Sequence, residues 1–213
     1  MSGRGVRLTG GAFRGRSLAV PAGARPTEGR VREALFSIWR ERLDGSRFLD
    51  LFAGSGAVGI EAAGRGALWV VCVDQDAQAV RAVAANVSTL TGGRAASVAA
   101  GRAASLGGGV IEARRLTLPG GLARLAAECD AAGARTAAGL RPAVFDLVFA
   151  DPPYRFDAFE PLLLALPPLL AAGAEVAIEH SARRDLPPAA GPIVRTDLRR
   201  YGESALAFYR APG

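Results

Sequence analysis

A turn rich in small residues follows an acid in the first third of the chain, and together they could hold a nucleotide-like ligand. Asp50 precedes a turn in which Gly54, Gly56 and Gly59 have the G-x-G-x-x-G spacing, which lets a backbone approach a bound nucleotide closely. Asp74 follows Gly54 after 20 residues, a distance at which an acid can accept hydrogen bonds from ribose hydroxyls. The pattern predicts a nucleotide-containing cofactor; the alternative is a turn that needs glycine only for its backbone shape.

The carboxylate of Asp50 helps to choose between two kinds of cofactor. A dinucleotide such as NAD places its pyrophosphate at the N-terminus of the helix that follows the glycine turn, and a nearby carboxylate would repel it. S-adenosyl-L-methionine (SAM) has no phosphate and carries an ammonium and a sulfonium group, which an acid attracts. We therefore expect SAM as the cofactor. The residues expected to bind it are Asp50, Ala53, Gly54, Ser55, Gly56 and Asp74.

A second candidate site follows the apolar segment 146–150, in the sequence Asp151-Pro152-Pro153-Tyr154. The two prolines have a fixed φ and no N–H, so they can form a stiff turn whose carbonyls face a ligand. Asp151 and one such carbonyl could accept both hydrogens of an exocyclic amine and turn its lone pair toward an electrophile. Tyr154 offers a ring on which an extruded base could stack. These four residues are the predicted catalytic residues, against the alternative of a proline turn that simply closes a strand.

Strand-like and helix-like segments alternate after residue 47 and should bring the two motifs together. Such alternation predicts an α/β, Rossmann-like fold: a seven-stranded, mainly parallel sheet with an antiparallel edge strand. In such sheets ligands bind beyond the carboxyl ends of the strands, where the strand order reverses, so Gly54 and Asp151 should face one crevice. Residues 91–109 have no periodicity and are expected to form a loop. The expected strands are 47–52, 68–74, 110–114, 144–150, 174–179, 192–198 and 204–210; the expected helices are 28–43, 56–65, 76–89, 119–130 and 157–171.

The excess positive charge of the chain lies in its first 47 residues. They contain ten arginines and four acids, a balance of 10 − 4 = +6, which equals the net charge of the whole chain. Residues 5–20 read as a basic β-hairpin, and we expect a boundary between this extension (1–24) and a catalytic domain (25–213). A polyanion such as RNA suits this charge; the alternative is a solvated surface. The residues expected to contact RNA are Arg4, Arg7, Arg14, Arg16, Arg25, Arg30 and Tyr154.

Composition excludes several other classes of protein. With 213 residues the chain is long enough for one domain. No apolar run is long enough to cross a membrane, and the start has no signal-peptide pattern, so a cytoplasmic protein is expected. The isolated Cys72 and Cys129 and the single histidine, His180, form no metal-ligand spacing, so no metal is expected.

The motifs together resemble a known family. The segments 50–56 and 151–154 are similar to those of class I SAM-dependent amino-methyltransferases. The segments 13–16, 25–39 and 200–206 narrow the resemblance to the RsmD family, whose members methylate the N2 amine of one guanine in bacterial 16S ribosomal RNA. The resemblance implies SAM as the cofactor, and 16S ribosomal RNA or the assembling small ribosomal subunit as the partner. It implies that the glycine turn lies against the methionine part of SAM and that the second motif holds the target guanine.

Three alternatives stay open at this point. A DNA adenine-N6 methyltransferase would share the 151–154 motif, but such enzymes usually carry a target-recognition module. An NAD-dependent oxidoreductase would leave Asp50 and the proline turn unexplained. A catalytically silent RNA-binding module would not need Asp151 or Gly54.

Overall fold

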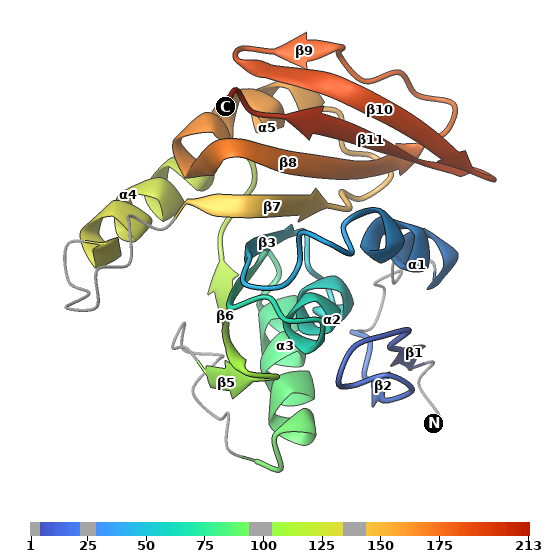
Figure 1. Ribbon diagram of the computed structural model, residues 1–213, viewed down its shortest axis with the longest axis vertical. Helices are drawn as coiled ribbons and strands as arrows, with labels where there is room; N and C mark the ends of the chain where they lie inside the picture. Colours follow the sequence, from blue (N-terminus) through green and yellow to red (C-terminus); the bar gives the residue numbers. More distant parts are fainter. Residues whose placement is uncertain (1–4, 22–28, 94–103, 134–143) are drawn as a thin grey trace.

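The computed structural model describes residues 5–21, 29–93, 104–133 and 144–213, which form a mixed sheet with helices on both faces (Figure 1). Within these residues the main sheet has nine strands. In spatial order they are β5 (Ala104–Leu106), β6 (Gly109–Arg115), β4 (Trp69–Asp74), β3 (Arg47–Leu51), β7 (Phe145–Ala150), β8 (Leu170–Ser181), β11 (Ser204–Arg210), β10 (Ile193–Tyr201) and β9 (Ala189–Ala190).

The strand order confirms the predicted α/β, Rossmann-like architecture. Strands β6, β4, β3, β7 and β8 are parallel, and the order reverses between β3 and β7, where ligands bind in such sheets. All seven predicted strands are present in the described residues, and the short strands β5 and β9 extend the sheet to nine. β11 runs antiparallel to both of its neighbours, β8 and β10, because the short β10–β11 connection folds it back between them. The two edge strands, β5 and β9, are also antiparallel to the strands beside them.

Three segments differ from expectation. The helix expected over 28–43 ends at Ile38 and is followed by turns. Residues 104–106, expected in a loop, form β5 because they pair with β6 in an antiparallel ladder; residues 94–103 of the expected loop lie outside the described residues. The helix expected over 157–171 ends early, since two prolines after Leu166 interrupt its hydrogen bonds, and β8 begins at Leu170.

Two hydrophobic clusters lie on the two faces of the sheet. One joins the sheet to α1, α2 and α3, on the right of the strands in Figure 1; the other joins it to α4 and α5. Side chains alternate between faces along each strand. In β3, Leu49 and Leu51 belong to the second cluster, so Asp50 between them faces the side of α1, α2 and α3. The helices are α1 (Gly29–Ile38), α2 (Ala57–Gly64), α3 (Ala77–Leu90), α4 (Leu122–Gly133) and α5 (Phe159–Ala165).

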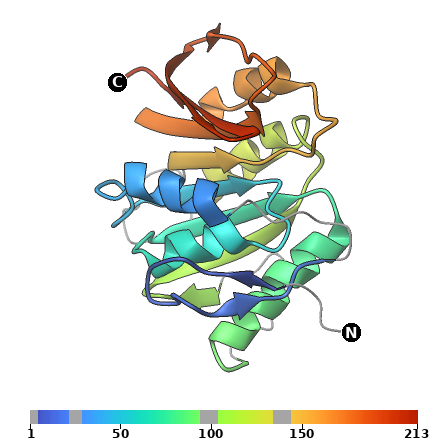
Figure 2. The same cartoon turned by 90° about the vertical axis from the view of Figure 1, so that its right-hand side faces the viewer.

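The N-terminal hairpin shares the core of the sheet domain. Strands β1 (Val6–Arg7) and β2 (Ser17–Leu18) pair antiparallel, as predicted, and the hairpin lies across α2 and α3 (Figure 2). Leu8 and Leu18 are almost fully buried in the cluster that contains α1, α2 and α3. The boundary expected between residues 24 and 25 lies outside the described residues. In the described part of the chain, none of the helices is long and apolar enough to cross a membrane.

Candidate functional site

The glycine turn directly follows β3 and has a backbone shape that depends on its small residues. Gly54 has φ 54° and Gly56 has φ 76°, both in the left-handed region that glycine adopts without strain. Gly56 is also the N-cap residue of α2. Phe52 has φ 59° as well, and a bulky residue in this region carries a conformational cost that is typical of functional sites.

Asp74, at the end of β4, holds this turn in place. Its Oδ2 accepts a hydrogen bond from the backbone N–H of Gly54 at 2.9 Å. Its Oδ1 accepts one from the N–H of Asp76 at 2.9 Å, while the Asp76 side chain caps α3 by accepting from the N–H of Gln78. A carboxylate offers about four lone-pair positions, so Asp74 can hold the turn and still accept hydroxyl hydrogens from a ligand.

Asp50 is buried beneath the turn and is electrostatically coupled to the second motif. Its Oδ2 accepts the N–H of Gly59 at 2.8 Å. Burial raises the pKa of Asp50 to about 7, against the lowering effect of the Gly59 hydrogen bond, and the negative charges of Asp151 and Asp74 add to the rise. The carboxyl groups of Asp50, Asp74 and Asp151 therefore come from three neighbouring strands and repel one another. A cation bound among them would be strongly attracted.

The Asp151–Tyr154 turn continues β7 at the same edge of the sheet. The backbone N–H of Asp151 lies 3.4 Å from the carbonyl oxygen of Leu51, the last residue of β3. The Pro153 carbonyl accepts the N–H of Phe156 at 2.7 Å, which closes the turn. Pro152 is buried, whereas the Tyr154 side chain is 83% exposed. A flat ring in this position is accessible to a base.

Two aromatic rings connect the two motifs. The rings of Phe52 and Phe156 meet edge to face, with centroids 5.1 Å apart. Edge-to-face pairs of this kind stabilise by about 0.5–1.5 kcal/mol beyond their buried area. The contact ties the strained residue of the glycine turn to the loop that follows Tyr154, so the two halves of the site are held at a fixed separation.

The basic hairpin is anchored close to the glycine turn. Asn86 of α3 accepts the N–H of Ala19, donates to the Ala19 carbonyl, and donates to the Ser55 carbonyl at 2.9 Å. One side chain thus connects the end of β2 with the predicted cofactor loop. A cleft of about 730 Å³ lies between the hairpin and the start of α1, with Arg7 and Arg14 in its lining.

Not every arginine expected to contact RNA can be placed. The side chains of Arg7, Arg14, Arg16 and Arg30 are exposed. Arg4 and Arg25 lie outside the described residues.

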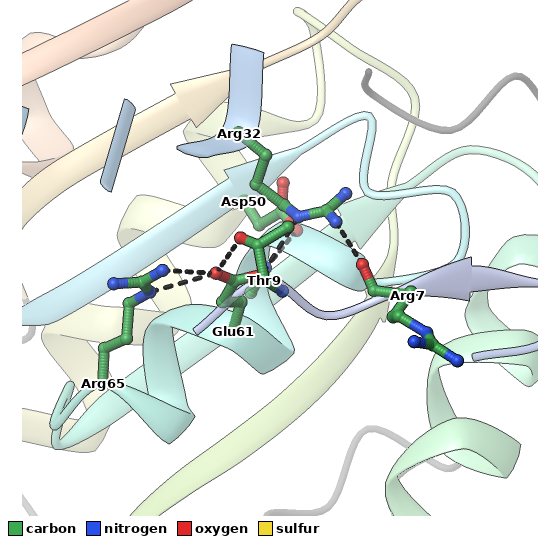
Figure 3. Close-up of polar contacts among 7 residues, drawn as sticks. Arg7, Thr9, Arg32, Asp50, Glu61 and Arg65 are labelled. Atoms are coloured by element: carbon green, nitrogen blue, oxygen red, sulfur yellow. Dashed lines mark hydrogen bonds and ion pairs between the residues drawn. The ribbon is translucent and has the colours of Figure 1, made fainter. Parts of the chain in front are cut away.

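A buried charged cluster beneath the hairpin was not predicted from the sequence (Figure 3). Glu61 of α2 is fully buried and accepts hydrogen bonds from the backbone N–H and hydroxyl of Thr9, at 2.9 and 2.6 Å. It also accepts from Arg32 Nε at 3.0 Å and from Arg65, and Arg32 donates in turn to the Arg7 carbonyl. The cluster fixes the hairpin and α1 against α2. A lone acid in the otherwise apolar helix 57–64 was the signal that could have revealed it.

The structure therefore brings the predicted cofactor residues and catalytic residues to one edge of the sheet. Asp50, Ala53–Gly56 and Asp74 form one side of this edge, and Asp151–Tyr154 the other. Among the described residues, no group of three or more histidine, cysteine, aspartate or glutamate side chains could hold a metal ion.

Comparisons with known proteins show which family the chain resembles. A family model described as conserved hypothetical protein 95 matches residues 6–108 and 121–210. The chain is 32% identical over 212 residues to a Bacillus subtilis protein named "Putative rRNA methyltransferase YlbH", covering 98% of this chain and 100% of that protein. It is 42% identical over 97 residues to the ribosomal RNA small subunit methyltransferase D of Escherichia coli, covering 44% of this chain and 49% of that protein.

A solved structure also aligns over nearly the whole chain. It is titled "Putative methyltransferase yhhF from Escherichia coli" and has a TM-score of 0.73 at 26% identity, covering 98% of this chain and 99% of that one.

Proposed function

The chain belongs to the conserved hypothetical protein 95 family, and on this premise we propose that it transfers a methyl group from SAM to the exocyclic N2 amine of a guanine in 16S ribosomal RNA. The observation that carries the proposal is that the glycine turn, held by the Asp74–Gly54 hydrogen bond, and the Asp151–Tyr154 turn follow the carboxyl ends of the adjacent parallel strands β3 and β7. The names of the relatives, which include rRNA methyltransferases, support the substrate class.

The residues present at this edge fit SAM. Asp74 can accept ribose hydroxyls, and the acids around Asp50 favour the ammonium and sulfonium charges. The left-handed Gly54 and Gly56 allow close approach of the turn, and a Cβ at Gly54 would meet no atom of the described residues within 4 Å, which leaves room above this glycine for a ligand. A pyrophosphate would meet Asp50 and Asp151 with like charge, which argues against NAD.

When bound, SAM supplies an electrophilic methyl group on its sulfonium. We assign Asp151 and the carbonyl of Pro152 as acceptors for the two hydrogens of the guanine N2 amine, since the Pro153 carbonyl closes the turn. Holding both hydrogens turns the nitrogen lone pair toward the methyl carbon. Methylation would make the amine nitrogen more acidic, and Asp151 or water would accept the proton that it loses. Tyr154 stacks on the face of the extruded base.

The exposed arginines of the hairpin supply the RNA contacts in this proposal. Arg7, Arg14 and Arg16 project from a hairpin that Asn86 and Glu61 fix to the domain, and Arg30 is exposed at the start of α1. Phosphate contacts of this kind position the RNA without reading its sequence. Arg4 and Arg25 are proposed to extend the same surface.

Two measurements test the proposal. SAM at about 100 times its dissociation constant should stabilise the purified protein by roughly 2.7 kcal/mol, and NAD should not. Methyl-labelled SAM should then transfer its label to small-subunit ribosomal RNA and not to double-stranded DNA. Stabilisation by NAD alone, or labelling of DNA alone, contradicts the proposal.

A further inference from the structure

A fourth acid, Glu179, lies at the same edge of the sheet, on the strand next to Asp151. Strands β7 and β8 are parallel, with Ala150 opposite Ile178. One residue further along each strand, Asp151 and Glu179 are at the same level on adjacent chains, which run about 4.8 Å apart in a sheet.

The side chain of Glu179 also faces the side of the sheet that Asp151 faces. In β8, Ala177 belongs to the cluster with α1, α2 and α3, and Ile178 to the opposite cluster. In β7, Phe149 and Ala150 divide in the same way. Because side chains alternate, Glu179 follows Ala177 onto the face of α1, α2 and α3, where Asp50 also lies.

Because Glu179 is buried, its carboxylate is well suited to recognise a base through hydrogen bonds. Glu179 is 7% exposed, and hydrogen bonds to a carboxylate in such a desolvated place are stronger than in water. A carboxylate accepts hydrogen bonds and donates none when ionised. It therefore selects a ligand edge that presents N–H groups.

We propose that Glu179 is a specificity-determining residue that accepts a hydrogen bond from the N1–H of the target guanine. This inference rests on the proposed function, since it places the guanine at Asp151. The Watson–Crick edge of guanine carries its N1–H beside the N2 amine, so acceptors on two adjacent strands match two adjacent donors. Adenine presents a bare N1, which a carboxylate repels. Glu179 thus makes the site select guanine over adenine, whereas Asp151 orients the amine of either base.

The test compares guanine with 2-aminopurine, which keeps the amine on C2 but has no hydrogen on N1. Wild-type protein first locates the methylated nucleotide, and ligated RNA then carries either base at that position. We expect wild type to favour guanine, because its N1–H satisfies Glu179. In Glu179→Gln the side-chain amide can donate to the bare N1, so the guanine to 2-aminopurine ratio of kcat/KM should fall by about 10- to 100-fold. Dissociation constants of both RNAs, measured with S-adenosylhomocysteine present, should shift in the same direction.

Glu175→Gln is the matched control. Glu175 lies in the middle of the same strand, four residues before Glu179, where it accepts from Trp39 Nε1 and pairs with Arg42. This change should lower stability without altering the base ratio. If Glu179→Gln leaves the ratio at the wild-type value, the inference is overturned even though guanine is methylated. If wild type makes no N2-methylguanosine, the proposed function itself fails.

Discussion

The Oδ2 atom of Asp74 accepts a hydrogen bond from the backbone N–H of Gly54 at 2.9 Å. This bond joins the carboxyl end of β4 to the glycine turn after β3, across a separation of 20 residues in the chain. Asp74 therefore both fixes the shape of the glycine turn and is the acid expected to bind the ribose. Changing Asp74 should disturb the turn, and changing the turn should displace the Asp74 carboxylate.

Replacing Asp74 tests whether it holds the glycine turn and binds SAM. Asp74→Ala removes the acceptor of the Gly54 N–H and of the ribose hydroxyls, so SAM affinity should weaken by about 10- to 100-fold, as for the loss of hydrogen bonds to a charged group. Isothermal titration calorimetry measures it. Asp76→Ala is the control: it removes the α3 cap, which costs about 1 kcal/mol of stability, and should leave SAM affinity unchanged. Equal affinities for Asp74→Ala and wild type contradict the assignment.

The spacing of Gly54 and Asp74 was visible in the sequence because a strand, a turn and a helix occupy a nearly fixed length of chain. The position of Asp151 at the same sheet edge as Gly54 followed from the same rules of parallel sheets, although 97 residues separate them (151 − 54 = 97). Both motifs lie at strand ends, where backbone topology alone decides which residues meet.

Asp50 should make folding and SAM binding depend on pH. Burial, with the charges of Asp151 and Asp74, raises its pKa from 3.8 to about 7. The folded protein therefore keeps a proton that the unfolded chain releases. The proton on folded Asp50 adds to the free energy of unfolding. This added stability is fully present below about pH 4, declines as the pH rises to about 7, and does not change further above that. Urea denaturation across this range should show the decline in wild type and not in Asp50→Asn.

The same residue should release a proton when SAM binds. A bound cation favours the ionised carboxylate, so SAM affinity should rise as the pH increases toward 7 and then level off. Calorimetry in buffers of different ionisation enthalpy measures the proton release near pH 6. Asp50→Asn is expected to bind SAM more weakly and to release no proton. A wild-type affinity that does not change between pH 5.5 and 8 contradicts a cationic group at Asp50.

Asp151 should act on the amine more than on the cofactor. In Asp151→Ala, turnover should fall by about 10²–10³, as when one preorganised polar partner is lost, while SAM affinity changes little. Asp151→Asn keeps one acceptor oxygen and should lose less if the residue orients the amine. Single-turnover rates at saturating RNA measure both variants. Near-normal rates in Asp151→Ala would show that the assignment is wrong.

Salt dependence of RNA binding should identify the hairpin contacts. Arg14→Ala and Arg16→Ala should each reduce the log–log slope of RNA affinity against salt by about 0.7–0.9, because each removes one phosphate contact. Arg124→Ala is the control, since this exposed arginine lies on α4, on the opposite face of the sheet. If all three variants keep the wild-type slope, the hairpin arginines are a solvated surface.

Contacts that depend on how separate elements pack together could not be predicted from the sequence. Arg32 was one of ten arginines in a basic segment, and its burial against Glu61 depends on how α1 packs on α2. Glu179 stood in an apolar strand without a motif, and its relation to Asp151 became visible only from the β7–β8 register. Leu8 and Leu18 looked like parts of a separate hairpin, yet they pack into the main core. Tertiary packing decides all three.

Nucleoside mass spectrometry of 16S ribosomal RNA tests the central claim most directly. The RNA is taken from a strain in which the gene for this chain has been deleted, and from the same strain complemented with the wild-type or the Asp151→Ala gene. The account predicts that N2-methylguanosine is lost from one position on deletion, returns with the wild-type gene and does not return with Asp151→Ala. Unchanged N2-methylguanosine in the deletion strain, with or without the loss of another modified nucleoside, would contradict it.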